Sequence, residues 1–475
     1  MNEALARQTM EGGRFGDHLV ALGHMTREKL DAFIHKTPVE PDTIEATGLE
    51  ETDLISLLMK LIYTWRIESA REFSDAIKLP THLVMRLIRT ATERKLLYAK
   101  GVRPDNAAAM NYAMTEEGQR WAMDALHRSQ YTGPAPVTLE EYCERVNLQK
   151  ITNEVVTYQR VRANVSDLAM EDALVEQSGP ALNSGRAILL FGPPGNGKTT
   201  FALRLAHIFS DIVYIPYAVT VEGQVIRVFD PSIHIPIKPN DSAGEGVASI
   251  LRNDAVDARW IACKRPFVIA GGELTLEMLD LRYDETSKFY EAPLHMKALG
   301  GCFVIDDFGR QLVTPTTLLN RWIVPLESRV DFLKLHTGKS FSIPFDELVI
   351  FSTNLTPKDL MDPAFLRRIP FKLEIPSPTR EDFKQIFHSV AAARGLISTD
   401  QIVAAVIAAL QELGGTALAS YQPKFIIDQV VAGCKFEDIP PRFRADLIAM
   451  AIGNLSTEKA PGPARGPDGI APASN

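Results

Sequence analysis

The chain is poor in cysteine and has no long hydrophobic run. Its four cysteines are scattered over 475 residues without a C-x-x-C pair, which argues against a disulfide framework and a cysteine zinc site. The longest apolar run, IVAAVIAAL at 402–410, is far shorter than the roughly 20 residues that cross a bilayer. The first residues also lack the apolar segment of a signal peptide. These absences predict a cytoplasmic protein without membrane insertion.

An excess of positive charge is missing as well. The chain has 51 Lys and Arg against 59 Asp and Glu, a formal net charge of −8. A protein that coats nucleic acid by bulk electrostatics carries the opposite sign, so only a local basic patch is compatible with such a role. A chain of this length exceeds one compact core, which predicts two to four domains.

Residues 51–130 predict three helices, a hairpin and a further helix. The second helix stops at Pro80, and the third, THLVMRLIRTATERKLL, is expected to be capped by Thr81. Two short strands, LLYAK and NYAM, follow around a Gly/Pro/Asn turn. The pattern resembles a winged helix-turn-helix domain, which implies either DNA contact or a protein-docking domain with a solvated basic face. The cations in question are Arg86, Arg89, Arg94 and Lys95.

The two ends of the chain predict little chemistry. Segment 13–34, GRFGDHLVALGHMTREKLDAFI, resembles one copy of the N-terminal motif of type II secretion and type IV pilus ATPases, some of which bind cyclic di-GMP. Those modules use two copies, so a helical docking segment and a cyclic dinucleotide site both stay open here. The Pro/Gly/Ala-rich tail, STEKAPGPARGPDGIAPASN, predicts disorder.

The strongest pattern is a glycine-rich loop between a buried strand and a helix. AILLFGPPGNGKTT matches G-x-x-x-x-G-K-[ST] and leads into FALRLAHIF. Backbone N–H groups of such a loop surround phosphate oxygens, its Lys reaches the β- and γ-phosphates, and its Thr hydroxyl ligates Mg²⁺. The predicted ATP-binding residues are Gly192, Pro193, Pro194, Gly195, Asn196, Gly197, Lys198, Thr199 and Thr200.

A second buried strand, CFVI, ends in Asp306 and Asp307. Asp306 is predicted to hold Mg²⁺ together with Thr199, while Asp307 orients or deprotonates the attacking water. Many relatives carry Glu at the second position, and Asp shortens the reach by one C–C bond, about 1.5 Å. Two outcomes therefore stay open: a competent hydrolase with a shifted backbone, or a slow ATPase that acts as a switch.

Further motifs resemble those of AAA+ ATPases. The strand DELVIFSTNLTP resembles the sensor-1 strand, which implies that Asn354 positions the attacking water. DPAFLRRIPF resembles the segment of the arginine finger, which neutralises a neighbouring subunit's transition state, with Arg367 and Arg368 as candidates and Arg368 preferred. The helices after Pro376 resemble the AAA+ lid, where Lys424 stands in place of the usual sensor-2 Arg.

The stretch DFLKLHTGKSFSIPF at 331–345 predicts two short strands around a turn. It resembles the pre-sensor-1 hairpin of the clade with MoxR-type and magnesium-chelatase ATPases. More than a hundred residues also separate Thr200 from Asp306. By resemblance this insertion faces a pore or a neighbour, which makes Phe289 and Tyr290 candidate partner-contacting aromatics unless they are core residues.

These patterns predict an α/β fold: a P-loop AAA+ core with a parallel sheet and a helical lid, after an α+β winged-helix domain. His234, His295 and His336 share no ligand spacing and are interpreted as structural or surface histidines. The predicted protein is an ATP- and Mg²⁺-dependent ring ATPase, a hexamer by resemblance, that remodels an unknown protein client; the alternative is a DNA-directed ATPase. The predicted segments are a small helical segment 1–45, the winged helix 46–132, a helical linker 133–180, the core 181–375, the lid 376–454 and the tail 455–475.

Overall fold

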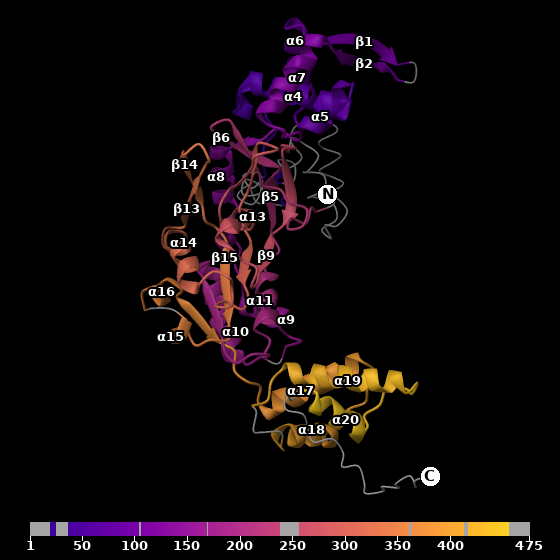
Figure 1. Cartoon of the computed structure of the whole chain (residues 1–475), viewed down its shortest axis with the longest axis vertical. Coiled ribbons are helices and arrows are strands. Elements are labelled where there is room, and N and C mark those ends of the chain that lie inside the picture. The colour runs from indigo at the N-terminus through magenta and orange to yellow at the C-terminus, as the bar shows by residue number, and fades with distance from the viewer. Residues whose placement is uncertain are drawn as a thin grey trace, which may run out of the picture.

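The computed structural model shows an elongated row of units (Figure 1). Helices of residues 51–128 lie at one end, the main sheet in the middle and the helices of residues 380–453 at the other end. Most of segment 13–34 and the tail from 456 lie outside the described residues, and so do the predictions made for them. The described residues are 20–24, 37–103, 106–168, 170–237, 256–360, 363–412 and 417–455.

The first unit consists of three helices, an antiparallel hairpin and a fourth helix. A capping box between Ser69 and Glu72 fixes the start of its second helix. Pro80 occupies the N-cap of the third helix and Thr81 is its first residue, so the predicted Thr81 cap is wrong. The elements are η1 (Glu45–Thr47), α4 (Glu51–Trp65), α5 (Ala70–Ile77), α6 (Thr81–Glu93), β1 (Leu97–Arg103), β2 (Asn106–Met114) and α7 (Glu116–Arg128).

A mostly helical segment connects this unit to the main sheet. A capping box between Thr138 and Glu141 starts its first long helix. Its opening strand pairs with a strand some 80 residues further on, a pairing that the expected helical linker did not include. The elements are β3 (Val137–Thr138), α8 (Leu139–Leu148), η2 (Ile151–Asn153), α9 (Tyr158–Asn164) and α10 (Asp172–Ser184).

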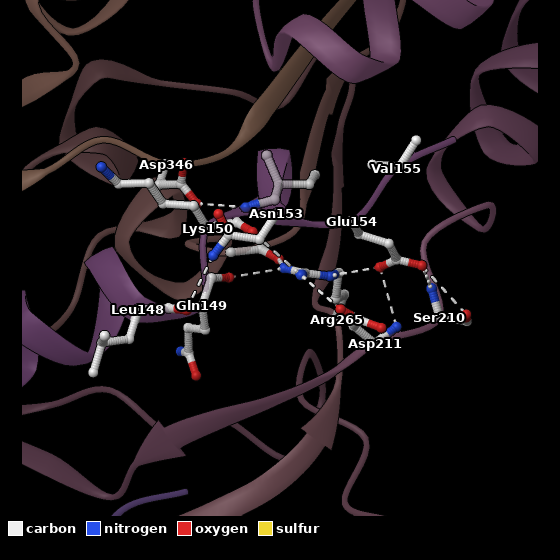
Figure 2. Close-up of polar contacts among 12 residues, drawn as sticks. Leu148, Gln149, Lys150, Asn153, Glu154, Val155, Ser210, Asp211, Arg265 and Asp346 are labelled. Atoms are coloured by element: carbon white, nitrogen blue, oxygen red, sulfur yellow. Dashed lines mark hydrogen bonds and ion pairs between the residues drawn. The ribbon is translucent and has the colours of Figure 1, made fainter. Parts of the chain in front are cut away.

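A buried ion pair fastens this segment to the body of the protein (Figure 2). The guanidinium of Arg265 donates from Nε to Glu154 Oε2 at 3.2 Å and from Nη1 to Gln149 O at 3.1 Å. Glu154 also accepts from the backbone N–H groups of Ser210 and Asp211 at 2.8 and 3.1 Å. The carboxylate is therefore satisfied on several sides, as a buried charge requires.

The insertion between the glycine-rich loop and the second Asp motif supplies four short strands of a mixed five-stranded sheet, ordered β10-β11-β7-β6-β3, and β3 of the connecting segment completes it. Tyr290 is 1% exposed, and Phe289 packs edge-on against Tyr131 with ring centroids 5.8 Å apart. Tyr290 is thus a core residue, and Phe289 is half-buried against the first unit. The elements are β5 (Ile212–Pro216), β6 (Ala218–Val221), β7 (Gln224–Arg227), β8 (Trp260–Lys264), η3 (Leu276–Leu279), β10 (Arg282–Asp284), β11 (Phe289–Glu291) and α13 (Leu294–Lys297), with β5 and β8 paired antiparallel.

The main sheet has five parallel strands in the spatial order β16-β4-β15-β12-β9. The predicted α/β fold with a parallel sheet is confirmed. Because β15 lies between β4 and β12, residues that follow these three strands meet at one edge of the sheet. The strands are β4 (Ile188–Phe191), β9 (Phe267–Ala270), β12 (Cys302–Ile305), β15 (Leu348–Thr353) and β16 (Phe371–Glu374).

Apolar layers cover both faces of this sheet, which explains the continuous apolar runs of its strands. Ile188 and Leu190 of β4 face one layer, in which the helices after β4 and before it pack, and Leu189 faces the other layer. Trp322 is fully buried in that second layer. The first layer contains α10 and α11 (Lys198–Ala206). The second layer contains α14 (Pro315–Ser328), α15 (Pro357–Leu360) and α16 (Pro363–Arg368).

Residues 330–344 form the predicted pair of strands, β13 (Val330–Lys334) and β14 (Ser340–Pro344), in an antiparallel hairpin. The C-terminal helices share an apolar core of their own, which includes Phe383, Phe387 and Val430. They are α17 (Arg380–Ala393), α18 (Asp400–Glu412), α19 (Tyr421–Phe436) and α20 (Ala445–Gly453). We refer to α17–α20 as the lid helices.

Candidate functional site

The glycine-rich loop after β4 adopts a conformation that only glycines accept easily. Gly192, Gly195 and Gly197 have φ values of 140°, 78° and 83°, in the region that L side chains rarely adopt. A Cβ on Gly192 would lie 2.2 Å from the carbonyl oxygen of Ile375, and one on Gly195 would lie 2.4 Å from the Tyr421 ring. The loop thus passes close to the lid helices before α11 begins at Lys198.

Lys198 lies at the mouth of this loop and is only 6% exposed. Its ammonium group donates to the carbonyl oxygens of Gly192 and Pro193 at 3.0 and 2.8 Å. Burial lowers the pKa of Lys198, and the charges of Asp307 and Asp306 oppose that shift. The cation is therefore held close to two carboxylates, in reach of any anion bound by the loop.

Thr199 and Asp306 lie side by side although 107 residues separate them in sequence. The Thr199 hydroxyl contacts the two oxygens of the Asp306 carboxylate at 3.0 and 2.8 Å. A hydroxyl and a carboxylate are oxygen ligands of the kind that Mg²⁺ prefers. The donor set present at this edge of the sheet therefore fits a magnesium ion.

Asp307 follows at the end of the same strand in a left-handed conformation, with φ 48°. Asn354, at the end of β15, donates from its side-chain amide to Asp307 Oδ1 at 3.2 Å. Asp tolerates positive φ better than most residues. The second carboxylate and the residue predicted to position water are thus hydrogen-bonded to each other.

Gln311 stabilises the turn that carries both aspartates. Its side-chain amide donates to the carbonyl oxygens of Asp306 and Asp307 at 2.9 and 3.3 Å, and its Oε1 accepts from the N–H of Gly309. Gln311 was not among the residues predicted from the sequence. A side-chain amide four to five residues after the aspartates was the available signal, since Gln carries both a donor and an acceptor.

The lid helices contact the glycine-rich loop directly. The N–H of Tyr421 donates to Gly195 O at 3.0 Å, and the N–H of Ser420 donates to the side-chain oxygen of Asn196 at 3.2 Å. Lys424, one turn further along α19, lines a cleft next to this loop. The lid helices and the glycine-rich loop are therefore directly linked, a link that the sequence does not reveal.

A cleft of about 730 Å³ joins most of these groups. Apolar residues at one side, among them Leu168, Met170 and Ile386, contrast with the polar edge of the sheet. Of the predicted nucleotide residues, Gly192 and Pro193 do not line it, although both carbonyls bind Lys198. The predicted residues that do line it are Pro194, Gly195, Asn196, Gly197, Lys198, Thr199, Thr200, Asp306, Asp307, Asn354 and Lys424.

Arg367 and Arg368 lie elsewhere, on a second hollow of the surface. Arg368 pairs with Glu327, Nε to Oε1 at 2.7 Å, and lies over the ring of Phe365. Arg367 is exposed. The structure therefore brings neither arginine to the cleft of its own chain.

The three histidines serve the packing of the insertion and its neighbours. His234 is buried and accepts from the N–H of Asp230 at 2.9 Å, and His295 is buried 2.7 Å from the Asp331 carboxylate. His336 stacks on Tyr283 with ring centroids 4.1 Å apart. Among the described residues, no group of three or more His, Cys, Asp and Glu is placed to hold a metal.

Comparison with known proteins assigns a family to the C-terminal helices. Residues 379–454 match a family described as a domain of unknown function (DUF8689), less than half of the chain. No curated protein matches this chain. The described part contains no helix that is both long and apolar enough for a membrane span.

Solved structures similar to this chain include a point mutant of RuvB from Thermotoga maritima. It is 16% identical, with 64% of this chain and 73% of RuvB covered and a TM-score of 0.32. The Thermotoga maritima structure named as the RuvB Holliday junction branch migration motor is also 16% identical, covering 61% and 70%, at a TM-score of 0.33. NtrX from Brucella abortus is 13% identical, covering 73% of this chain and 62% of NtrX, at a TM-score of 0.36. Scores this low assign neither a fold nor an activity to this chain.

Proposed function

We propose that this protein is an AAA+-type ATPase that binds ATP with Mg²⁺, hydrolyses it, and uses the turnover to remodel a protein partner. One observation carries the proposal. The Thr199 hydroxyl lies against the Asp306 carboxylate at the mouth of the glycine-rich loop, with the Asp307–Asn354 pair next to it. A phosphate cradle, a pair of magnesium ligands and a base candidate thus share one cleft.

Binding would begin with the triphosphate at the N-terminus of α11. The backbone N–H groups of residues 195–199 would surround its phosphate oxygens, and Lys198 would leave the carbonyls of Gly192 and Pro193 to bind them. The apolar side of the cleft, with Leu168 and Ile386, would take the purine. Thr199 and Asp306 would hold Mg²⁺, which when bound neutralises charge on the phosphate oxygens.

Hydrolysis would then depend on Asp307 and Asn354. As water attacks the γ-phosphorus and the bond to the leaving oxygen breaks, the Asp307 carboxylate would take the proton of the water, while the Asn354 amide orients both. Asp is shorter than Glu by about 1.5 Å. The left-handed backbone at Asp307, φ 48°, is the kind of local shift that can restore its position.

The ring arrangement is proposed from Arg367 and Arg368. Both lie away from the cleft of their own chain, as expected of a cation that serves a neighbour's site. Since Arg368 is engaged by Glu327 and Arg367 is exposed, we place Arg367 first as the finger. A homohexamer is proposed by resemblance alone.

Mechanical work would pass through the lid. The hydrogen bonds from Tyr421 to Gly195 and from Ser420 to Asn196 link α19 to the phosphate loop, and Lys424 would add a charged hydrogen bond to the nucleotide. Because the contact of Lys424 with the γ-phosphate would form when ATP binds and be lost after hydrolysis, the lid helices would shift in each cycle. The proposal has three further parts. The protein would lie in the cytoplasm. The β13–β14 hairpin would place it in the MoxR-like clade, and α4–α7 would form a winged-helix adaptor.

Lys198→Ala is expected to weaken ATP binding by about tenfold or more, because charge-assisted hydrogen bonds to phosphate are lost. Isothermal titration of the full chain with a non-hydrolysable ATP analogue and Mg²⁺ measures this loss. Lys334→Ala, which removes an exposed lysine of the β13–β14 hairpin, is the control. Unchanged affinity in Lys198→Ala would show that the glycine-rich loop is not the nucleotide site.

The second candidate is a DNA-directed ATPase, since Arg86, Arg89, Arg94 and Lys95 are all exposed on α6 or just after it. Glu45 engages Arg86 at 3.0 Å in an exposed pair. This role predicts duplex binding that weakens steeply as the salt concentration rises. The slope of the logarithm of the binding constant against the logarithm of the salt concentration should fall in magnitude by about 0.9 for each phosphate contact removed. Fluorescence anisotropy of Arg86→Glu/Arg89→Glu, against Arg120→Glu on α7, tests it. DNA binding equal to the wild type in the double variant would exclude the role.

A further inference from the structure

A second cavity, remote from the nucleotide cleft, lies between the first helical unit and the insertion sheet. Its volume is about 560 Å³, within the range of small-molecule pockets. From the first unit, α4 and the end of α7 line it, and from the insertion the β6–β7 turn and Lys288 line it. We call it the α4–β7 cavity.

The cavity gathers positive charge in an acidic protein. Lys60, Arg128 and Lys288 line it, whereas Asp53 is the only carboxylate among the described residues that line it. Within the described stretches, none of these three cations forms an ion pair. The Lys60 ammonium donates to Ser129 O at 3.0 Å and that of Lys288 to His127 O at 2.7 Å, which leaves further N–H donors on each.

Lys60 is the unusual member of this set, because it is 7% exposed and has no carboxylate partner in the part of the chain that the structure describes. Burial, followed by the nearby charge of Arg128, lowers the pKa of Lys60 to about 8, while Asp53 acts in the opposite sense. Buried cations are ordinarily paired. A desolvated ammonium beside a second cation thus creates a demand for an anion at this place.

Apolar side chains line the cavity beside the cations, and two of them share α4 with Lys60. Leu54 and Leu57 are buried there, and Val225, Pro136 and Tyr131 complete it. The Tyr131 hydroxyl is already used, since it donates to Pro134 O at 2.8 Å. A ligand that fits must therefore combine an apolar body with a charged group.

We propose that the α4–β7 cavity binds a small organic phosphate, with the phosphate between Lys60, Arg128 and Lys288 and an apolar body against Leu54 and Leu57. Three cations against one carboxylate leave a surplus of two positive charges, which a dianionic phosphomonoester balances and a carboxylate does not. Because the cavity walls belong to the first unit and to the insertion sheet, an occupant would fasten the first unit to the rest of the chain.

Titration of the full chain with phenyl phosphate tests this site, with benzoate and phenol as comparison probes. Lys198→Ala serves as the background, so that phosphate binding at the glycine-rich loop is suppressed. We expect one saturable site for phenyl phosphate, at least about tenfold weaker binding of benzoate, and no binding of phenol. Absence of saturable phenyl phosphate binding would overturn the proposal, and equal affinity for benzoate would overturn the phosphate assignment.

Two substitutions place the binding in this cavity. Lys60→Met keeps the length of the side chain and is expected to weaken phenyl phosphate binding about tenfold or more. Arg128→Gln removes an exposed cation, so it gives the same readout without altering a buried position. Arg120→Gln, an exposed arginine on α7 paired with Glu117, is the matched control. Binding that is unchanged in both cavity variants would contradict the site.

Discussion

Asp307→Asn is expected to lower ATP turnover by about 100-fold or more while ATP binding stays close to the wild type. The amide has the size of the carboxylate but cannot accept the proton of the attacking water, and general bases contribute about 10²–10⁴ in rate. Lys198, Thr199 and Asp306 are untouched, so the groups proposed to hold the nucleotide remain. Phosphate release under saturating ATP and a binding titration measure the two quantities separately.

Asp124→Asn, an exposed change on α7, controls for the loss of one negative charge. If Asp307→Asn leaves turnover and partner release unchanged, the protein is a nucleotide-gated switch with negligible hydrolysis. The inactive variant loaded with ATP should also retain the client in a pull-down, because the ATP-bound state then persists. Recovery of the same protein with Lys198→Ala under the same conditions would show that capture does not depend on nucleotide.

Asp307→Glu distinguishes the two outcomes left open by the short carboxylate. If the left-handed backbone at Asp307, φ 48°, already compensates for the missing methylene, Glu would overreach and turnover would fall. If the short side chain instead slows the enzyme, Glu would raise turnover, and misplacements of this size are worth about 100-fold. A single rate measurement, compared with the wild type, separates the two.

The sequence predicted best those features that local chemistry determines. The glycine-rich loop is a contiguous motif, and Thr199 and Asp306 were both assigned to one Mg²⁺, which requires that they approach each other. That approach is present in the structure at 2.8 Å. Asp307 and Asn354 were both assigned to the attacking water, whereas the neighbouring positions of β12 and β15, which bring them together, are seen in the structure alone.

The features that the sequence missed depend on contacts between short or distant elements. The strands of the insertion sheet have two to four residues, too few for an apolar period to indicate register. The link from Tyr421 to Gly195 joins backbone atoms 226 residues apart, and no side-chain pattern encodes it. Phe289 and Tyr290 were ambiguous because an aromatic pair looks the same in a core as on an interface.

Arg265→Met is expected to lower the free energy of unfolding of the central unit by about 3 kcal/mol, the lower end of the range for breaking a buried ion pair, because Glu154 keeps Arg160 as a second partner. Arg265 and Glu154 are both about 95% buried, and the guanidinium also serves the carbonyl oxygens of Gln149 and Gly300. Methionine fills the space but donates no hydrogen bond. Urea denaturation followed by tryptophan fluorescence measures the shift in the midpoint.

Arg204→Met is the matched control, because Arg204 pairs with Asp167 in a largely exposed ion pair. Such pairs contribute about 0–1 kcal/mol, so the two variants should differ clearly.

Burial raises the pKa of Glu154, but the hydrogen bonds from Ser210, Arg160 and Asp211 outweigh it and lower the pKa overall. The stabilisation by Glu154 is therefore complete above its unfolded pKa of 4.5 and is lost as the pH falls through the lower folded value. The difference between Arg265→Met and the wild type should narrow over that acidic range. Equal effects of Arg265→Met and Arg204→Met near neutral pH would show that the Arg265–Glu154 pair does not fasten residues 149–154 to the body of the protein.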